Sequence, residues 1–199
     1  MNVLNRYLAA AADAVLANEG TIDKFLGDAV MAWFNAPIPQ PDHTLRAVKA
    51  ALGIRASVQR LQHQLPPEFR LSFGAGIYYG EAVLGLVGTE KRTDYTAIGD
   101  TTNLAARMES MAEPGTVMVS PETYKQVAQQ FEFSPKGKTA IKGKDEALDV
   151  YVLVKEKIDR PRLGMERQIF SEMVGRDKEL NKLELQINKA IDGPDSLLN

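Results

Sequence analysis

The sequence predicts an α+β fold, an α/β sandwich in which helices alternate with pairs of strands. Two observations lead to this fold class: several segments repeat apolar residues at helical spacing, and short runs of β-branched and aromatic residues lie between them. Gly-Asp and Pro-Gly pairs separate the runs and mark turns. The 199 residues, 44% hydrophobic and 25% charged, suffice for one domain with a substantial core and an appendage.

The first part of the chain predicts a helix followed by a hairpin. Apolar residues at helical spacing stop before Gly20, which can supply a left-handed cap. These positions are Leu4, Tyr7, Leu8, Ala11 and Val15. Residues 21–25 and 29–34 are rich in strand-forming side chains, and the intervening Gly27 favours a tight turn. Asp28 is therefore expected at the tip of this hairpin.

A long helix and a second pair of strands are expected next. Asp42 follows a proline-rich stretch and is suited to cap a helix, which Pro66 then ends. Residues 71–79 and 82–87 are expected to pair as strands around a turn at Gly80-Glu81.

The remaining pattern alternates short strands and helices. A strand reaching Gly99 is followed by a helix over residues 100–111, in which Asn103 and Arg107 are four apart and leave the same face. The expected elements after it are a strand at 116–120, a short helix at 121–129 and a closing strand at 147–154. Residues 155–172 then predict a linker, and residues 173–199 are expected to contain a helix with one apolar stripe.

Composition narrows the class of function. The net charge of −2 and a pI near 5.8 give no electrostatic case for nucleic-acid or membrane-surface binding. The chain has no cysteine, hence no disulfide framework and no thiolate metal site. No leader peptide and no apolar run of the roughly 20 residues that span a bilayer is found. We expect a cytoplasmic, soluble chain or a soluble part of a larger protein.

Polar residues of the expected hairpin and of the expected helix over residues 100–111 suggest a site for a metal-bound nucleoside triphosphate. A carboxylate at a hairpin tip, here Asp28, can ligate Mg²⁺, although a turn aspartate without a ligand is the more common case. Lys24 lies in an apolar strand and must reach solvent or an acceptor. Arg107 and Asn103 can bind phosphate and sugar oxygens, or form a plain surface pair. No Walker A loop or G-x-G-x-x-G motif is present.

Three spaced motifs resemble the catalytic domain of class III adenylyl and guanylyl cyclases. They are Asp23-Lys24-Phe25-x-Gly-Asp28, Gly76-Ile77-x-x-Gly80-Glu81 and Tyr95-Thr96-Ala-Ile-Gly-Asp-x-x-Asn103-x-Ala-x-Arg107, followed by Lys142 before the last strand. The resemblance covers residues 1–154. It implies a ferredoxin-like nucleotide cyclase fold, conversion of ATP to cyclic AMP and pyrophosphate with two Mg²⁺ or Mn²⁺ ions, and a homodimer whose active sites form between subunits.

The resemblance also assigns residue roles. Asp28 matches a metal-binding aspartate, Asn103 the ribose-orienting asparagine and Arg107 the arginine that stabilises the transition state. Lys142 matches a lysine that contacts the terminal phosphates, and Lys24 with Thr96 matches the pair that recognises the purine. A lysine donates to N1 of adenine and a hydroxyl accepts from its amine, whereas guanine presents the opposite pattern. Guanylyl cyclases use glutamate and cysteine there.

The chain departs from the family pattern at both ends. The family's first strand, with its second metal-binding aspartate, precedes the first helix, and this chain is expected to begin after it. Met173 to Leu180 resembles the segment that opens a signal-transduction ATPase domain downstream of such cyclases. Two alternatives to an adenylate cyclase stay open: a catalytically incomplete regulatory or nucleotide-binding module and, disfavoured by Lys24 and Thr96, a guanylate cyclase.

Overall fold

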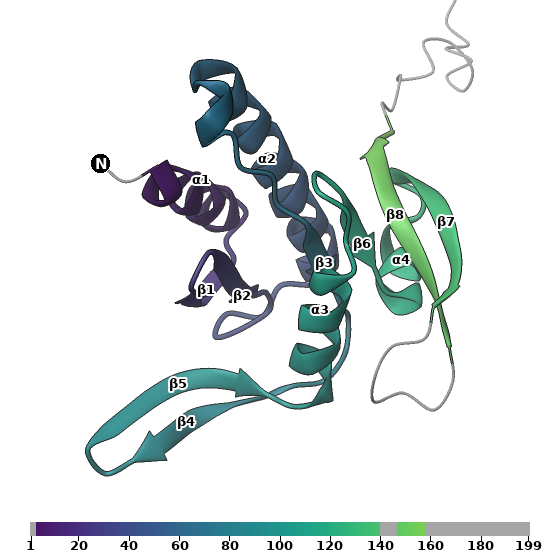
Figure 1. The fold of residues 1–199 in the computed structure, drawn as a ribbon. Helices are drawn as coiled ribbons and strands as arrows, with labels where there is room; N and C mark the ends of the chain where they lie inside the picture. The colour runs from purple at the N-terminus through teal and green to yellow at the C-terminus, as the bar shows by residue number, and fades with distance from the viewer. Residues whose placement is uncertain (1–2, 140–146, 158–199) are drawn as a thin grey trace, which may run out of the picture. The chain divides into compact units, whose positions relative to one another are not determined.

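The computed structural model describes residues 3–139 and 147–157, all within the first of two units of the chain, Met1–Asp159. Its elements are α1 (Val3–Ala17), β1 (Thr21–Leu26), β2 (Ala29–Trp33), α2 (His43–Gln64), the 3-10 turn η1 (Pro67–Phe69), β3 (Ala75–Ile77), β4 (Val83–Thr89), β5 (Arg92–Ile98), α3 (Asp100–Ser110), β6 (Val117–Val119), α4 (Pro121–Val127), β7 (Phe131–Thr139) and β8 (Leu148–Glu156) (Figure 1). The expected helix within residues 173–199, nearly all of the linker and Lys142 lie outside the described residues.

The strands form one central sheet and two separate hairpins, so the α+β fold class is confirmed. The central sheet has the order β3-β6-β8-β7, with β3 parallel to β6 and the other pairs antiparallel. The hairpins are β1–β2 and β4–β5. Figure 1 shows the β4–β5 hairpin extending away from the central sheet as a long arm.

Helices cover both faces of the central sheet because β6 alternates its side chains. Val117 and Val119 are buried in a cluster with residues of α2 and α4, whereas Met118 between them is buried against Leu104 and Met108 of α3. Successive residues of a strand point to opposite faces, which explains this division. The position of α3 is therefore set by a buried contact with the sheet.

The N-terminal helices pack on each other through a third cluster. Tyr7 of α1 contacts Val58 of α2 and Leu65 beyond it, as the apolar spacing of both helices predicts. Glu19, and not Gly20, takes the positive φ after α1 (57°). Asp42 stands at the N-cap position of α2, but its side chain accepts a hydrogen bond from Arg46 instead of capping the helix, and this bond lowers the pKa of Asp42.

The expected pairing of residues 71–79 with 82–87 is wrong. Within residues 71–79 only Ala75–Ile77 forms a strand, and this strand, β3, pairs with β6 about forty residues later instead of with β4. β4 pairs with β5, so the hairpin turn lies at Glu90-Lys91 and not at Gly80-Glu81. Strand β7 was not expected at all, because Pro135 and Gly137 interrupt its pattern; its register shifts between these two residues.

Candidate functional site

The β1–β2 hairpin places Asp28 where the sequence predicts. Leu26 pairs with Ala29, so Gly27 and Asp28 are the two residues of the turn. Gly27 adopts φ +66°, which residues with a side chain rarely reach. Asp28 is exposed. Its carboxylate is therefore available to a ligand that approaches the hairpin tip.

A β-bulge in β1 changes the direction of the side chain that precedes Lys24. Ile22 pairs with Ala32 and Lys24 pairs with Met31, which leaves Asp23 as an extra residue without a cross-strand partner. In a regular strand, Asp23 and Lys24 would point to opposite faces. The bulge relaxes this alternation, and the Lys24 Nζ atom lies 3.7 Å from Asp23 Oδ1.

Asp23 also forms a hydrogen bond with Thr96, the residue that is expected to recognise the purine jointly with Lys24. The Thr96 hydroxyl of β5 donates a hydrogen bond to Asp23 Oδ2 over 2.6 Å, across 73 positions of sequence. The Asp23 side chain is only 1% exposed, and Thr96 is 8% exposed, whereas the Lys24 side chain is 35% exposed. One buried carboxylate thus brings Lys24 and Thr96 together.

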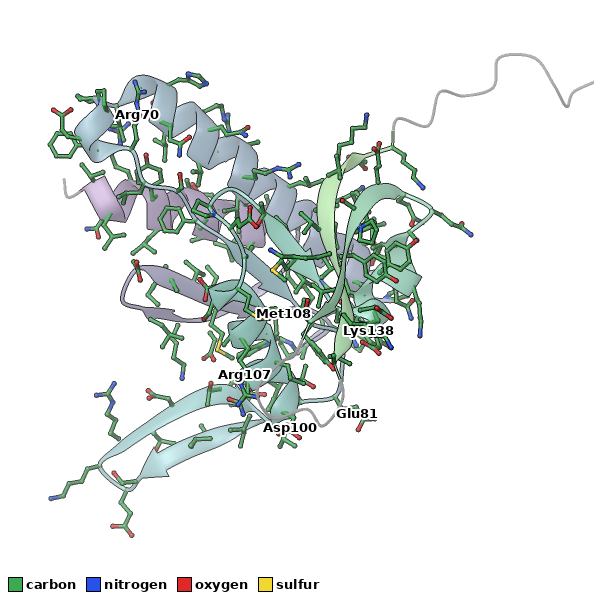
Figure 2. All side chains as sticks on the ribbon, turned by 45° about the vertical axis from the view of Figure 1, so that its right-hand side comes forward. Arg70, Glu81, Asp100, Arg107, Met108 and Lys138 are labelled. Atoms are coloured by element: carbon green, nitrogen blue, oxygen red, sulfur yellow. The ribbon has the colours of Figure 1, made fainter. Side chains whose placement is uncertain are left out.

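Helix α3 carries the other two expected residues on the side away from its buried face. Leu104 and Met108 are buried against the sheet, while Asn103 is exposed and Arg107 is partly exposed. The N-terminus of α3 is held by Thr101, whose hydroxyl donates to the Glu81 carbonyl oxygen over 2.5 Å. Figure 2 shows Arg107 and Asp100 on this helix, which adjoins β5.

Arg107 has no ion pair or side-chain hydrogen bond within the described part of the chain. A guanidinium that is partly covered and unpaired is free to bind an anion. Within residues 3–139 and 147–157, no hydrogen bond or ion pair joins Asp28, Asn103 or Arg107 to the group of Lys24, Asp23 and Thr96. The described residues therefore bring the expected purine-binding pair together without linking it to the other expected side chains.

Two surface cavities lie elsewhere in the described residues. One, of about 200 Å³, lies between α2 and the start of β3 and β6, and the other, of about 500 Å³, lies between α1 and α2. Neither is lined by Lys24, Asp28, Thr96, Asn103 or Arg107. The candidate site is therefore defined by its polar side chains and not by either cavity.

Sequence reasoning missed the role of Asp23. Asp23 is next to Lys24 in the sequence, but in a regular strand the side chains of neighbouring residues point to opposite faces. A carboxylate within a predicted strand was the available signal, since such a group needs partners when it is buried.

No helix in the described ranges is both long enough and apolar enough to cross a membrane.

Comparisons with known proteins point to one family. The model of the adenylate and guanylate cyclase catalytic domain matches residues 2–155. The chain is 37% identical over 158 residues to adenylate cyclase 1 of Rhizobium meliloti, covering 76% of this chain and 24% of that protein. It is 31% identical over 159 residues to an adenylate cyclase of Anabaena cylindrica, covering 74% of this chain and 31% of that protein. The chain thus matches less than a third of the length of these relatives.

Solved structures give the same fold with both purine preferences. The adenylyl cyclase CyaB from P. aeruginosa has a TM-score of 0.73 and 33% identity, over 79% of this chain and 83% of that chain. The guanylyl cyclase Cya2 has a TM-score of 0.73 and 30% identity, over 80% of this chain and 82% of that chain. The likeness of fold therefore leaves the choice of purine to the residues of the site.

Proposed function

This chain belongs to the family of adenylate and guanylate cyclase catalytic domains, and we propose that it is the cyclase domain of an enzyme that converts ATP to 3′,5′-cyclic AMP and pyrophosphate. The observation that carries the choice of ATP is the contact of Lys24 and Thr96 with one buried carboxylate. Lys24 donates to the unprotonated N1 of adenine, and Thr96 accepts from its exocyclic amine. Guanine has a proton at N1 and an oxygen at position 6, so it opposes both groups.

The reaction forms a bond between the ribose 3′ oxygen and the α-phosphorus, breaks the bond from that phosphorus to the pyrophosphate oxygen, and releases the proton of the 3′ hydroxyl to water. Asn103 orients the ribose for this in-line attack. Arg107 stabilises the negative charge that grows around the α-phosphate, a role that suits a guanidinium without a partner in the described residues. Lys142 contacts the terminal phosphates in this proposal.

Asp28 fits a divalent ion that arrives with the triphosphate. No group of three His, Cys, Asp or Glu side chains gathers within the described residues, so they offer no cage made of protein alone. Mg²⁺ and similar ions are commonly bound by one or two carboxylates, with water and phosphate oxygens completing the shell. When bound, Mg²⁺ or Mn²⁺ ions supply charge neutralisation at the phosphates and a more acidic attacking hydroxyl.

We propose that the active enzyme is a homodimer in which Asp28 of one subunit meets Arg107 and Asn103 of the other. The β4–β5 hairpin supports this proposal. It exposes large apolar side chains on both strands: Val83, Leu86, Val87, Tyr95 and Ile98. A projecting arm with this much exposed apolar surface is suited to bury it against a second copy.

The second candidate function is a regulatory module that binds nucleotide without converting it. This candidate is favoured because no group of three His, Cys, Asp or Glu side chains gathers within the described residues. In the cyclase proposal, a further strand carries the second metal-binding aspartate that the resemblance implies. β3 pairs only with β6 among the described strands, and β1–β2 forms a sheet of its own, so both have edges that a further strand can join. Residues 173–199 would open the ATPase-like region in either case.

The deciding experiment measures cyclic AMP from ATP with Mn²⁺ and, in parallel, cyclic GMP from GTP. It compares the 199-residue chain with the same chain fused to the segment that precedes the matching region in the Rhizobium meliloti relative. We expect cyclic AMP from the fused chain and at least tenfold less cyclic GMP. ATP binding without turnover in both chains would favour the regulatory module, and a preference for GTP would overturn the purine assignment.

A further inference from the structure

The β1–β2 hairpin does not need a charged side chain at position 23 in order to form. Its side chain is 1% exposed, and a buried carboxylate costs several kcal/mol of desolvation unless it is paired and hydrogen-bonded. An apolar residue of similar size would avoid this cost. The partners that Asp23 does have are therefore informative about its role.

Both contacts of the Asp23 carboxylate go to the expected purine-binding residues. Oδ2 accepts from the Thr96 hydroxyl at 2.6 Å, and Oδ1 lies 3.7 Å from the Lys24 Nζ atom. Oδ1 has no hydrogen-bond partner within the described residues. The carboxylate thus acts on Thr96 through a short hydrogen bond and on Lys24 through charge alone.

The hydrogen bond to Asp23 fixes what Thr96 can offer to a ligand. A threonine hydroxyl has one proton and two lone pairs, and it normally rotates to suit its neighbour as donor or acceptor. Here the proton is donated to Asp23 Oδ2. Only lone pairs remain for a purine, so Thr96 becomes an obligate acceptor.

We propose that Asp23 is the positioning residue that makes this site selective for a 6-aminopurine. This proposal about Asp23 rests on the proposed function of the chain. With its proton engaged, Thr96 accepts from the exocyclic amine of adenine and repels the 6-oxygen of guanine. A freely rotating hydroxyl would donate to that oxygen and discriminate poorly. Asp23 also keeps the Lys24 ammonium beside the hydroxyl, where it can donate to N1.

A purely structural role for Asp23 makes a different prediction. The bond from Asp23 to Thr96 also ties β1 to β5, and its loss would weaken that contact. A second contact, between the rings of Trp33 and Tyr95 at 6.4 Å, joins the same two hairpins and would remain. Loss of a structural tie would lower activity toward all purines alike, whereas loss of a positioning residue changes their ranking.

The test uses a nucleotide that differs only at position 6. The 5′-triphosphate of 6-methoxypurine riboside keeps an unprotonated N1 for Lys24 but replaces the amine with an acceptor oxygen. Its affinity and kcat/KM are compared with those of ATP in the fused chain described above and in the Asp23→Leu variant of that chain, which keeps the branching of the side chain's heavy atoms but removes the acceptor. We expect the wild type to prefer ATP by roughly 10- to 100-fold, and Asp23→Leu to lose at least tenfold of this preference, mainly through KM.

Two further variants separate the possible causes. Asp23→Asn keeps an oxygen that can accept from Thr96, so it should restore most of the preference. In a Thr96→Val background, Asp23→Leu should not change the ranking further, because the hydroxyl is already gone. An unchanged ranking in Asp23→Leu, with both nucleotides weakened equally, would overturn the proposal.

Failure of the proposed function has a separate signature. A wild-type chain that binds neither nucleotide would overturn both the cyclase proposal and the purine role of Asp23. The hydrogen bond itself is tested without nucleotide by the urea midpoints of Asp23→Leu, Thr96→Val and the double variant. Non-additive shifts support the bond, and additive shifts would overturn the inference even in a chain that binds ATP.

Discussion

Gly76 on β3 lies against the backbone of α3 at Met108: a Cβ added to this glycine would be 2.9 Å from the Met108 carbonyl carbon. The helix and the strand therefore pack with no side chain between them at this point. Because α3 carries Asn103 and Arg107, the absence of a side chain at residue 76 sets how closely these two groups approach the sheet.

Replacing Gly76 with alanine should displace α3 and lower both stability and activity. The added methyl group meets main-chain atoms that cannot rotate away. We therefore expect the free energy of unfolding to fall by about 1–3 kcal/mol and Tm to fall by roughly 5 °C. Thermal unfolding and cyclic AMP formation are the measurements. Gly85→Ala is the matched control, because a Cβ on that strand glycine meets nothing within 4 Å. Equal effects of both substitutions would contradict the close packing.

Arg107→Ala should reduce kcat for cyclic AMP formation by about 10²–10³-fold with little change in KM, because its charge is needed mainly in the transition state. Arg107→Lys should recover only part of the loss, since lysine lacks the planar fork of donors. The control is Arg60→Ala on α2, an exposed arginine whose side chain, among the described residues, bonds to Ser57 alone. A rise in KM at constant kcat would assign Arg107 to ground-state binding instead.

Mixing two inactive variants should restore activity if the sites form between subunits. An Asp28→Ala subunit and an Arg107→Ala subunit together build one intact site, so a mixture should reach about a quarter of wild-type activity. Leu86→Asp in both subunits should abolish this recovery, because Leu86 is 74% exposed on the hairpin proposed to contact the partner. A mixture that stays inactive while forming dimers would place Asp28 and Arg107 in the same site.

Local patterns were enough to predict the elements that present the site. The helical spacing around Tyr7, the turn at Gly27-Asp28 and the helix carrying Arg107 all follow from residues close in sequence. These signals depend on one segment at a time. They fixed where Asp28, Asn103 and Arg107 lie along the chain, though not what they contact.

Contacts between distant segments were not predictable in the same way. The three-residue strand β3 takes its partner from Val117–Val119, and no local pattern identifies a parallel partner so far away. The tie between Asp23 and Thr96 depends on a bulge, which shifts the alternation that sequence reasoning assumes. The wrong pairing expected for residues 71–87 and the failure to foresee the contacts of Asp23 both arise because these contacts join distant segments.

The contacts of Asp23 also determine how the purine preference can be changed. Lys24→Glu with Thr96→Cys introduces the guanylyl pattern, but the new glutamate stands beside a buried carboxylate that has lost its cation. We therefore expect this double variant to unfold at a lower urea concentration than the wild type, with a free energy of unfolding that is lower by about 1–3 kcal/mol.

Adding Asp23→Asn to the double variant removes the like-charge repulsion. The triple variant should regain stability and raise the kcat/KM ratio of GTP to ATP by at least tenfold. Asp23→Asn alone is the control and should keep the preference for ATP. A stable triple variant with unchanged ATP selectivity would rule out Lys24 and Thr96 as the residues that read the purine.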